Sequence, residues 1–216
     1  MPTSRGRLDF EGQNSIAILA FRADDQHPRL NSETLDELAA RLEEIRRSGL
    51  FRGVVIASSD RSFATGAEIE EIAQLKGFAA RRFAERGQAL LNSIAQFPVP
   101  VIAAIRGFCL GGGLDLALAC HGRVATFDSS FAHPGGVLGL MTGWGGTQRL
   151  PRMLGKPAAL QILLTGERIP ATQALTLGLV DELVSSQDLI RRAVAHAENR
   201  AAQMQPSQPG EIRAAR

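Results

Sequence analysis

The sequence predicts an α/β protein in which parallel strands alternate with helices. Short apolar runs, such as residues 53–58 and 99–105, are typical of buried strands. Longer segments between such runs carry apolar residues at helical spacing, and strand and helix alternate at least three times. This pattern favours parallel βα units, whose functional sites lie at the carboxyl ends of the strands.

Length and composition are those of a single globular domain with a sizeable core. The chain has 216 residues, of which 44% are hydrophobic, and its net charge is only +2. This charge gives no reason to expect a nucleic-acid or membrane partner. Residues 1–9 do not resemble a secretory signal. Cys109 and Cys120 lack a disulfide or metal-binding pattern, so we expect buried thiols, no metal ion and a cytoplasmic protein.

The first half of the chain predicts two strands and two clear helices. Residues 15–22 form the first strand, and a polar loop over residues 24–30 leads to Asn31 or Ser32 as a helix cap. The capped helix carries apolar residues at helical spacing and ends at Gly49. Further along are the strand 53–58, a loop 59–66, a short helical or irregular segment from Ala67, and a helix 78–96 that two prolines terminate.

The most informative stretch begins with the apolar strand 99–105. Three glycines at residues 111–113 follow it, and an apolar helix continues to residue 120. The free N–H groups and the positive dipole end of such a helix suit an oxygen that carries negative charge. Asp115 lies in the first turn, beside those donors.

The remaining elements are expected to be short. A glycine-rich turn over residues 135–146 leads into residues 147–150, and the tail from Met204 is polar. Strands are predicted over residues 123–127, 130–133 and 179–184, and helices over residues 157–165, 171–177 and 189–203.

Two loops follow two successive buried strands, over residues 63–69 and 111–113. Because parallel neighbours end at the same edge of a sheet, we expect the loops to lie side by side. Each loop could offer one backbone N–H, and two convergent donors make an oxyanion hole. Taken singly, each loop is weak evidence, since three glycines are more often a tight turn and Gly66-Ala67 could simply start a helix.

Four segments together resemble the enoyl-CoA hydratase/isomerase (crotonase) family. They are FATGAEI at residues 63–69, the run from PVIAAIRG to AC at residues 100–120, GWGGTQRL at residues 143–150, and LTGERI with the residues up to 180. Their order and spacing match from about residue 10 to residue 185. The resemblance implies a crotonase-like spiral of ββα units, a CoA thioester as substrate, no bound cofactor, a role in fatty-acid metabolism, and a homotrimer or hexamer.

The resemblance also implies which residues form the site. The N–H groups of Ala67 and Gly112 would hold the thioester carbonyl oxygen and so stabilise an enolate. The loop over residues 24–30 and the segment over residues 63–66 would lie near the CoA nucleotide. Substrate or CoA contacts are expected from Phe63, Gly66, Ala67, Glu68, Ile69, Gly111, Gly112 and Gly135.

The chain departs from the family at both acid positions. Hydratases of the family use two glutamates, which correspond here to Asp115 and Gly135. Hydration needs a paired acid and base, and one shortened carboxylate fits that task poorly. The resemblance as a whole still gives an enoyl-CoA hydratase/isomerase-type lyase or isomerase as the first expectation. The alternatives are an isomerase, hydrolase or decarboxylase that needs one acid, or a non-catalytic acyl-CoA-binding subunit.

Three candidates could replace the missing acid. His133 lies two residues before the second position, and histidine is the side-chain type suited to proton transfer near neutral pH; the alternative is simply a strand-end or surface histidine. Glu68, Glu70 and Glu71 follow the first donor loop, although solvated helix acids are the alternative. Asp115 could act alone, or could only complement the helix dipole.

The expected domain organisation is a crotonase-like core over residues 1–185, followed by a C-terminal helix and polar tail over residues 186–216. From the resemblance we expect this C-terminal helical region to be shortened, with the family's trimerisation helices truncated. A more open acyl pocket or a weaker trimer would follow. Trp144 is expected to serve packing rather than substrate contact.

Overall fold

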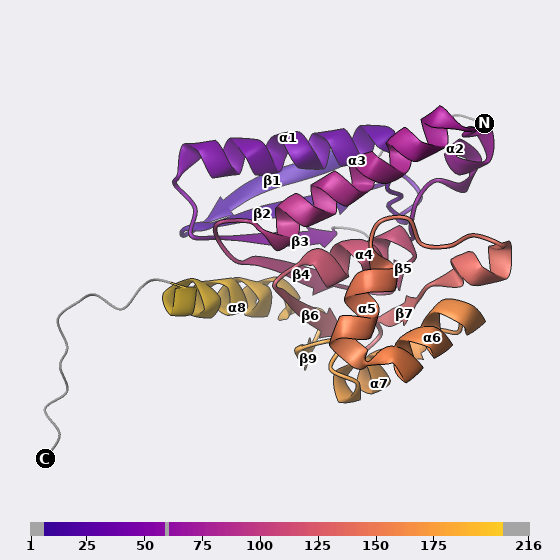
Figure 1. Ribbon diagram of the computed structural model, residues 1–216. Helices are drawn as coiled ribbons and strands as arrows, with labels where there is room; N and C mark the ends of the chain where they lie inside the picture. Colours follow the sequence, from indigo (N-terminus) through magenta and orange to yellow (C-terminus); the bar gives the residue numbers. More distant parts are fainter. Residues whose placement is uncertain (1–6, 59–60, 205–216) are drawn as a thin grey trace, which may run out of the picture.

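A computed structural model of the chain describes residues 7–58 and 61–204, and its centre is a mixed sheet (Figure 1). The strand order is β1-β2-β3-β4-β6-β9. Strands β1 and β2 pair antiparallel, whereas every later pair in this sheet is parallel. The predicted α/β class is therefore confirmed. The strands are β1 Arg7–Gln13, β2 Ile16–Arg22, β3 Gly53–Ser58, β4 Val101–Ile105, β6 Gly122–Thr126 and β9 Glu182–Val184.

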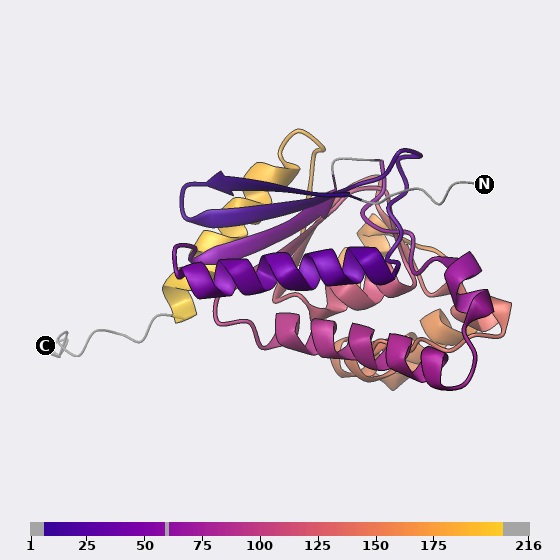
Figure 2. The same cartoon turned by 90° about the horizontal axis from the view of Figure 1, so that it is seen from above.

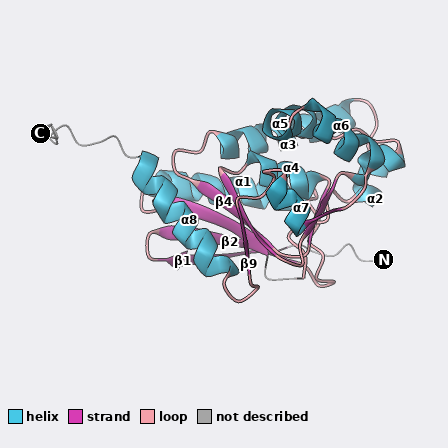
Figure 3. Ribbon diagram, turned by 90° about the horizontal axis from the view of Figure 1, so that it is seen from below, coloured by secondary structure: helices cyan, strands magenta, loops and turns pink. Residues whose placement is uncertain are grey.

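Helices cover both faces of this sheet, because successive strand residues point to opposite sides. In β3, Ile56 packs into the core beneath helices α1 (Ser32–Ser48) and α3 (Phe78–Ala95). The preceding residue, Val55, packs into a second core beneath α8 (Leu189–Met204). Figures 2 and 3 show α8 on the face opposite α1 and α3. The strands are therefore apolar on both faces, as continuous Val, Ile and Ala runs predict.

A second, three-stranded sheet stands beside the first and carries the central helix. It consists of β5 (Phe108–Leu110), β7 (Ser130–Ala132) and β8 (Ile169–Pro170). Helix α4 (Gly112–Ala119) follows β5 almost directly, and every residue after its first is buried. The apolar helix predicted after the three glycines is thus confirmed.

The shorter helices surround α4 and the small sheet. Helix α5 packs on both α4 and α6. Within the described ranges, no helix combines the length and the hydropathy that crossing a bilayer requires. The bounds are α2 Ile69–Gln74, a 3₁₀-helix η1 Pro134–Leu138, α5 Gly146–Leu154, α6 Lys156–Thr165 and α7 Ala171–Thr176.

The sequence pattern does not predict β1, β5 or α5. Strand β1 lies at the sheet edge, and its apolar face consists only of Leu8, which is buried, and Phe10, which is exposed, so the alternation is too short to stand out in the sequence. Strand β5 has three residues and exists through its pairing with β7, more than 20 positions along the chain. Helix α5 begins among glycines and contains Pro151, both of which argue against a helix from sequence alone.

The last predicted strand is too long, and the predicted tail is largely undescribed. Residues 179–184 form a strand only over Glu182–Val184, because the N–H groups of Leu179 and Val180 bond back to the Ala174 carbonyl, at 2.8 and 3.3 Å. Helix α8 includes Met204, and residues 205–216 lie outside the described part of the chain.

Buried side chains fix the C-terminal end of α4. The Arg123 guanidinium donates to the carbonyls of Cys120, at 3.0 Å, and Leu179, at 2.9 Å. The backbone N–H of Arg123 donates to Asp181 at 2.6 Å. Carbonyls at a helix C-terminus lack hydrogen-bond donors within the helix, and the buried guanidinium of Arg123 supplies such donors here. These bonds hold α4 between the two sheets.

His121 joins the end of α4 to the start of β4. Its backbone N–H donates to the Val101 carbonyl at 2.7 Å, and the Val101 N–H donates to His121 Nδ1 at 3.0 Å. The ring must be neutral to accept this bond. Burial, together with the positive charge of Arg200, lowers the pKa of His121.

We predict that His121 makes stability fall in mild acid. Since the folded-state pKa is below that of the unfolded chain, about 6.5, unfolded molecules take up the proton first as pH falls. The free energy of unfolding should therefore decrease below that pH. Urea unfolding at pH 7.5 and pH 5.5 tests this. The H121Q variant, whose amide oxygen can accept the same bond, should show a smaller decrease. An equal decrease in both proteins would contradict the assignment.

Candidate active site

The two predicted loops meet backbone to backbone. After β3 the chain runs beside β5, where the Ala64 N–H donates to the Phe108 carbonyl at 3.2 Å and the Leu110 N–H donates to the Ala64 carbonyl at 2.9 Å. Because β3 and β4 are parallel neighbours, both loops leave the same edge of the sheet. The expectation that the loops lie side by side is therefore confirmed.

This contact brings two backbone N–H groups together. A Cβ built on Gly112 would lie 3.5 Å from the Ala67 nitrogen, and one on Gly66 would lie 3.5 Å from the Gly112 nitrogen. Gly66 also has a φ of +103°, a region that favours glycine. Within the described part of the chain, neither the Ala67 N–H nor the Gly112 N–H donates to a protein acceptor. Both therefore remain available to a ligand.

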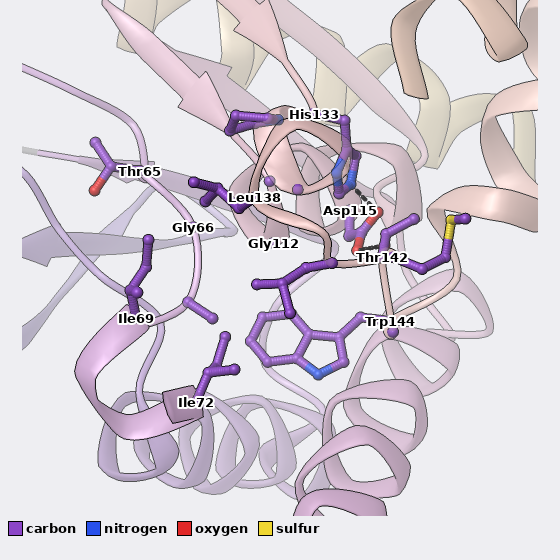
Figure 4. Close-up of a pocket in the computed structure, with 17 residues that line it drawn as sticks. Thr65, Gly66, Ile69, Ile72, Gly112, Asp115, His133, Leu138, Thr142 and Trp144 are labelled. Atoms are coloured by element: carbon purple, nitrogen blue, oxygen red, sulfur yellow. Dashed lines mark hydrogen bonds and ion pairs between the residues drawn. The ribbon is translucent and has the colours of Figure 1, made fainter. Parts of the chain in front are cut away.

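A pocket opens beside these two donors (Figure 4). Ile69, Ile72 and Leu138 contribute to its apolar wall, while Gly66 and Gly112 lie at its base. The structure thus brings most of the predicted contact residues to one cavity. The complete lining is Thr65, Gly66, Ala67, Ile69, Ile72, Gly111, Gly112, Asp115, His133, Pro134, Gly135, Leu138, Leu140, Met141, Thr142, Gly143 and Trp144.

Asp115 is buried at the side of the pocket and is hydrogen-bonded through both oxygens (Figure 4). His133 Nε2 lies 3.1 Å from Asp115 Oδ1, and the Thr142 hydroxyl donates to Oδ2. Gly146 leaves room for this carboxylate, since a Cβ there would lie 2.2 Å from Oδ1. Asp115 therefore does more than complement the helix dipole, because it anchors two other pocket residues.

His133 is not a surface residue, so that alternative is wrong. It directly follows β7 and is only 4% exposed. The strand-end position was expected, but the bond to Asp115 was not. Thr142 was missed altogether. It belongs to no recognisable motif in its glycine-rich segment, and only the folded structure shows that it hydrogen-bonds to Asp115.

No second carboxylate faces the pocket among its described lining residues. Gly135 does line it, as expected, but without an acidic side chain. Glu68 lies 3.8 Å from Arg29, and burial, together with a hydrogen bond that the protonated Glu68 carboxyl donates to Glu70, raises the pKa of Glu68. Glu71 accepts bonds from the hydroxyl and the N–H of Ser32. None of these three glutamates lines the cavity.

Phe63 is also outside the pocket. It is fully buried and packs edge-to-face on Phe21, with ring centroids 6.3 Å apart. Trp144, in contrast, both packs in the core and lines the pocket. Its indole ring contacts Phe83 and lies so close to Gly87 and Gly112 that a Cβ on either glycine would overlap it, at 2.2 and 2.5 Å.

The buried thiols are not suited to nucleophilic chemistry. Burial raises the pKa of Cys109 well above its ordinary value and raises that of Cys120 to about 12. Both thiols are therefore neutral near pH 7. Across residues 7–58 and 61–204, no three His, Cys, Asp or Glu residues cluster in a way that could hold a metal ion.

Comparison with known proteins now identifies the family. The family model described as enoyl-CoA hydratase/isomerase matches residues 11–209. The chain therefore belongs to the enoyl-CoA hydratase/isomerase family, and its fold is the crotonase fold. This membership places the pocket in a family of enzymes that act on CoA thioesters.

Solved structures of bacterial relatives agree. Enoyl-CoA hydratase subunit I of Geobacillus kaustophilus is 32% identical with a TM-score of 0.84, and the match covers 91% of this chain and 76% of that one. Enoyl-CoA hydratase of Bacillus anthracis is 31% identical with a TM-score of 0.85, covering 90% and 76%. DspI of Pseudomonas aeruginosa is 30% identical with a TM-score of 0.84, covering 92% and 76%.

We predict that G112A destabilises the protein. The new methyl group would overlap Trp144, which Gly87 and Phe83 prevent from moving aside, and overpacking of this kind costs about 1–3 kcal/mol. Urea unfolding followed by fluorescence measures the effect, since Trp144 is the only tryptophan. G143A is the matched control, because its Cβ meets nothing closer than Ala84 at 3.8 Å. Equal stability of the two variants would contradict the packing.

Proposed function

We propose that the pocket binds the acyl end of a CoA thioester, with the carbonyl oxygen between the N–H groups of Ala67 and Gly112. The observation that carries this proposal is the contact of the two loops, which leaves both donors free beside a buried carboxylate. Donors in this arrangement stabilise the negative charge that develops on the oxygen when an enolate forms. Removing one such donor typically costs about 2.7–4 kcal/mol of barrier stabilisation.

The reaction that fits best is a double-bond shift rather than hydration. Hydration adds water across a double bond and requires both an acid and a base. In an isomerisation, one group removes the α-proton and returns it at the γ-carbon while the oxyanion hole holds the enolate. Asp115 is the only carboxylate among the described lining residues. The pocket therefore has the groups for a single proton shuttle.

The rest of the pocket suits the acyl group. Its outer wall is apolar, with Ile69, Leu138 and Met141 partly exposed to solvent. Aliphatic acyl chains gain free energy by burying against such a wall. We further propose that the loop over residues 24–30 lies near the CoA nucleotide and that the protein assembles as a homotrimer or hexamer.

A panel of three assays tests the reaction. It measures hydration of crotonyl-CoA, conversion of a 3-enoyl-CoA to the 2-enoyl-CoA, and release of free CoA. We expect the double-bond shift to be fastest. The D115N variant should lose about 10²–10⁴-fold in kcat, the range for loss of general acid–base catalysis, because Asp115 is the pocket carboxylate on which proton transfer depends. Its binding of acetoacetyl-CoA should change little, because Asp115 does not supply the oxyanion donors.

The matched control is D128N, an exposed aspartate in the turn after β6. It should retain the wild-type rate. Faster hydration than isomerisation would overturn the preferred reaction. Tight binding of acetoacetyl-CoA without turnover in any of the three assays would instead identify a non-catalytic acyl-CoA-binding protein.

A further inference from the structure

The arrangement of Asp115, His133 and Thr142 assigns different roles to the two ionisable residues of the pocket. Asp115 has a hydrogen-bond partner on each oxygen and is 1% exposed. A carboxylate held on both sides is well placed to orient a neighbour. We propose that His133 transfers the proton to and from the substrate, and that Asp115 is its positioning residue. This inference rests on the proposed function.

The hydrogen bond selects the nitrogen that would react. An ionised carboxylate can only accept, so His133 Nε2 carries the hydrogen that points to Asp115 Oδ1. Nδ1 then has the free lone pair. It forms no hydrogen bond within the described part of the chain, and it is not among the fully buried unpartnered atoms. Nδ1 is therefore the available base.

Thr142 completes the arrangement. Its hydroxyl donates to Asp115 Oδ2, so the carboxylate cannot rotate without losing a bond on each side. Arg149 is a nearby cation that attracts the Asp115 carboxylate electrostatically without a direct hydrogen bond. Its guanidinium is bonded elsewhere, to the Trp144 carbonyl at 2.9 Å and to Asn92 at 2.7 Å. Arg149 thus leaves the Asp115 oxygens to His133 and Thr142.

The proton transfer balances without a further reactant. The C–H bond at the α-carbon of the acyl group breaks, and its proton forms a bond to His133 Nδ1. The electron pair moves into the enolate, whose oxygen is held by the Ala67 and Gly112 N–H groups. Asp115 stabilises the imidazolium that results. Returning the proton to the α-carbon regenerates the substrate, and delivering it to the γ-carbon completes the isomerisation.

Exchange of the α-protons of butyryl-CoA in D₂O, followed by NMR, isolates this step. The H133Q variant should lose about 10²–10⁴-fold in exchange rate, while Trp144 fluorescence reports unchanged binding of acetoacetyl-CoA. H196Q is the matched control, because His196 lies on α8 and contacts Glu182 instead. It should exchange like the wild type.

Two measurements do not depend on the folding of H133Q. Wild-type exchange should rise with pH, because only a neutral imidazole can accept the substrate proton. In T142V, which leaves His133 intact, kcat for the double-bond shift should fall with KM unchanged, and the pH profile should move. A structural role for Thr142 alone would not move the profile.

The outcomes separate this inference from the proposed function. Wild-type exchange that H133Q retains and D115N loses would make Asp115 the base and overturn the role of His133, with the proposed function intact. A wild-type exchange rate that does not rise with pH would also overturn it. A wild-type protein that neither binds acetoacetyl-CoA nor exchanges α-protons would overturn both.

Discussion

The site depends on the direct contact between the chain after β3 and the chain around β5. Three glycines permit it. Gly66 lies against the Leu110 carbonyl, Gly112 lies against Trp144, and a Cβ on Gly113 would come within 2.4 Å of the Ala64 carbonyl. A side chain at Gly66 or Gly113 would push the two segments apart, and one at Gly112 would overlap Trp144 beside them. The backbone must therefore be bare here, so that the Ala67 and Gly112 N–H groups can face one ligand atom.

The surrounding fold holds that contact in place. Strands β3 and β4 are parallel neighbours with cores on both faces, so they deliver the two loops to one edge. Helix α4 is buried along its length, and Arg123 occupies its C-terminal end. A helix that is buried and held at its C-terminal end keeps its first N–H groups oriented, which is the preorganisation that an oxyanion hole requires. Stability and function are thus linked through α4.

The sequence predicts the backbone of the site well. The buried strands have continuous apolar runs, three consecutive glycines leave the backbone bare, and the order of four motifs indicates the family. The core elements follow from local patterns. Strand β5 does not follow from local patterns, because it forms only by pairing with β7, which is distant in the sequence. Helix α5 does not either, because it begins among glycines and contains Pro151.

The side-chain network is the part that local patterns miss. Its three residues lie on different segments. His133 is 18 positions from Asp115 in the sequence, and Thr142 is 27 positions from it. No spacing rule joins a strand end, a helix turn and a glycine-rich loop. For Phe63 the sequence predicts a site residue where the structure has a core residue. Its motif suggests substrate contact, whereas its side chain packs on Phe21 in the core.

A crystal structure with acetoacetyl-CoA bound tests the central claim most directly. The distances from the thioester carbonyl oxygen to the Ala67 and Gly112 nitrogens decide it. We predict that both distances are about 2.7–3.1 Å, the range for oxyanion-hole donors. A carbonyl oxygen that approaches neither nitrogen, in a pocket that nevertheless holds the acyl group, would contradict the account.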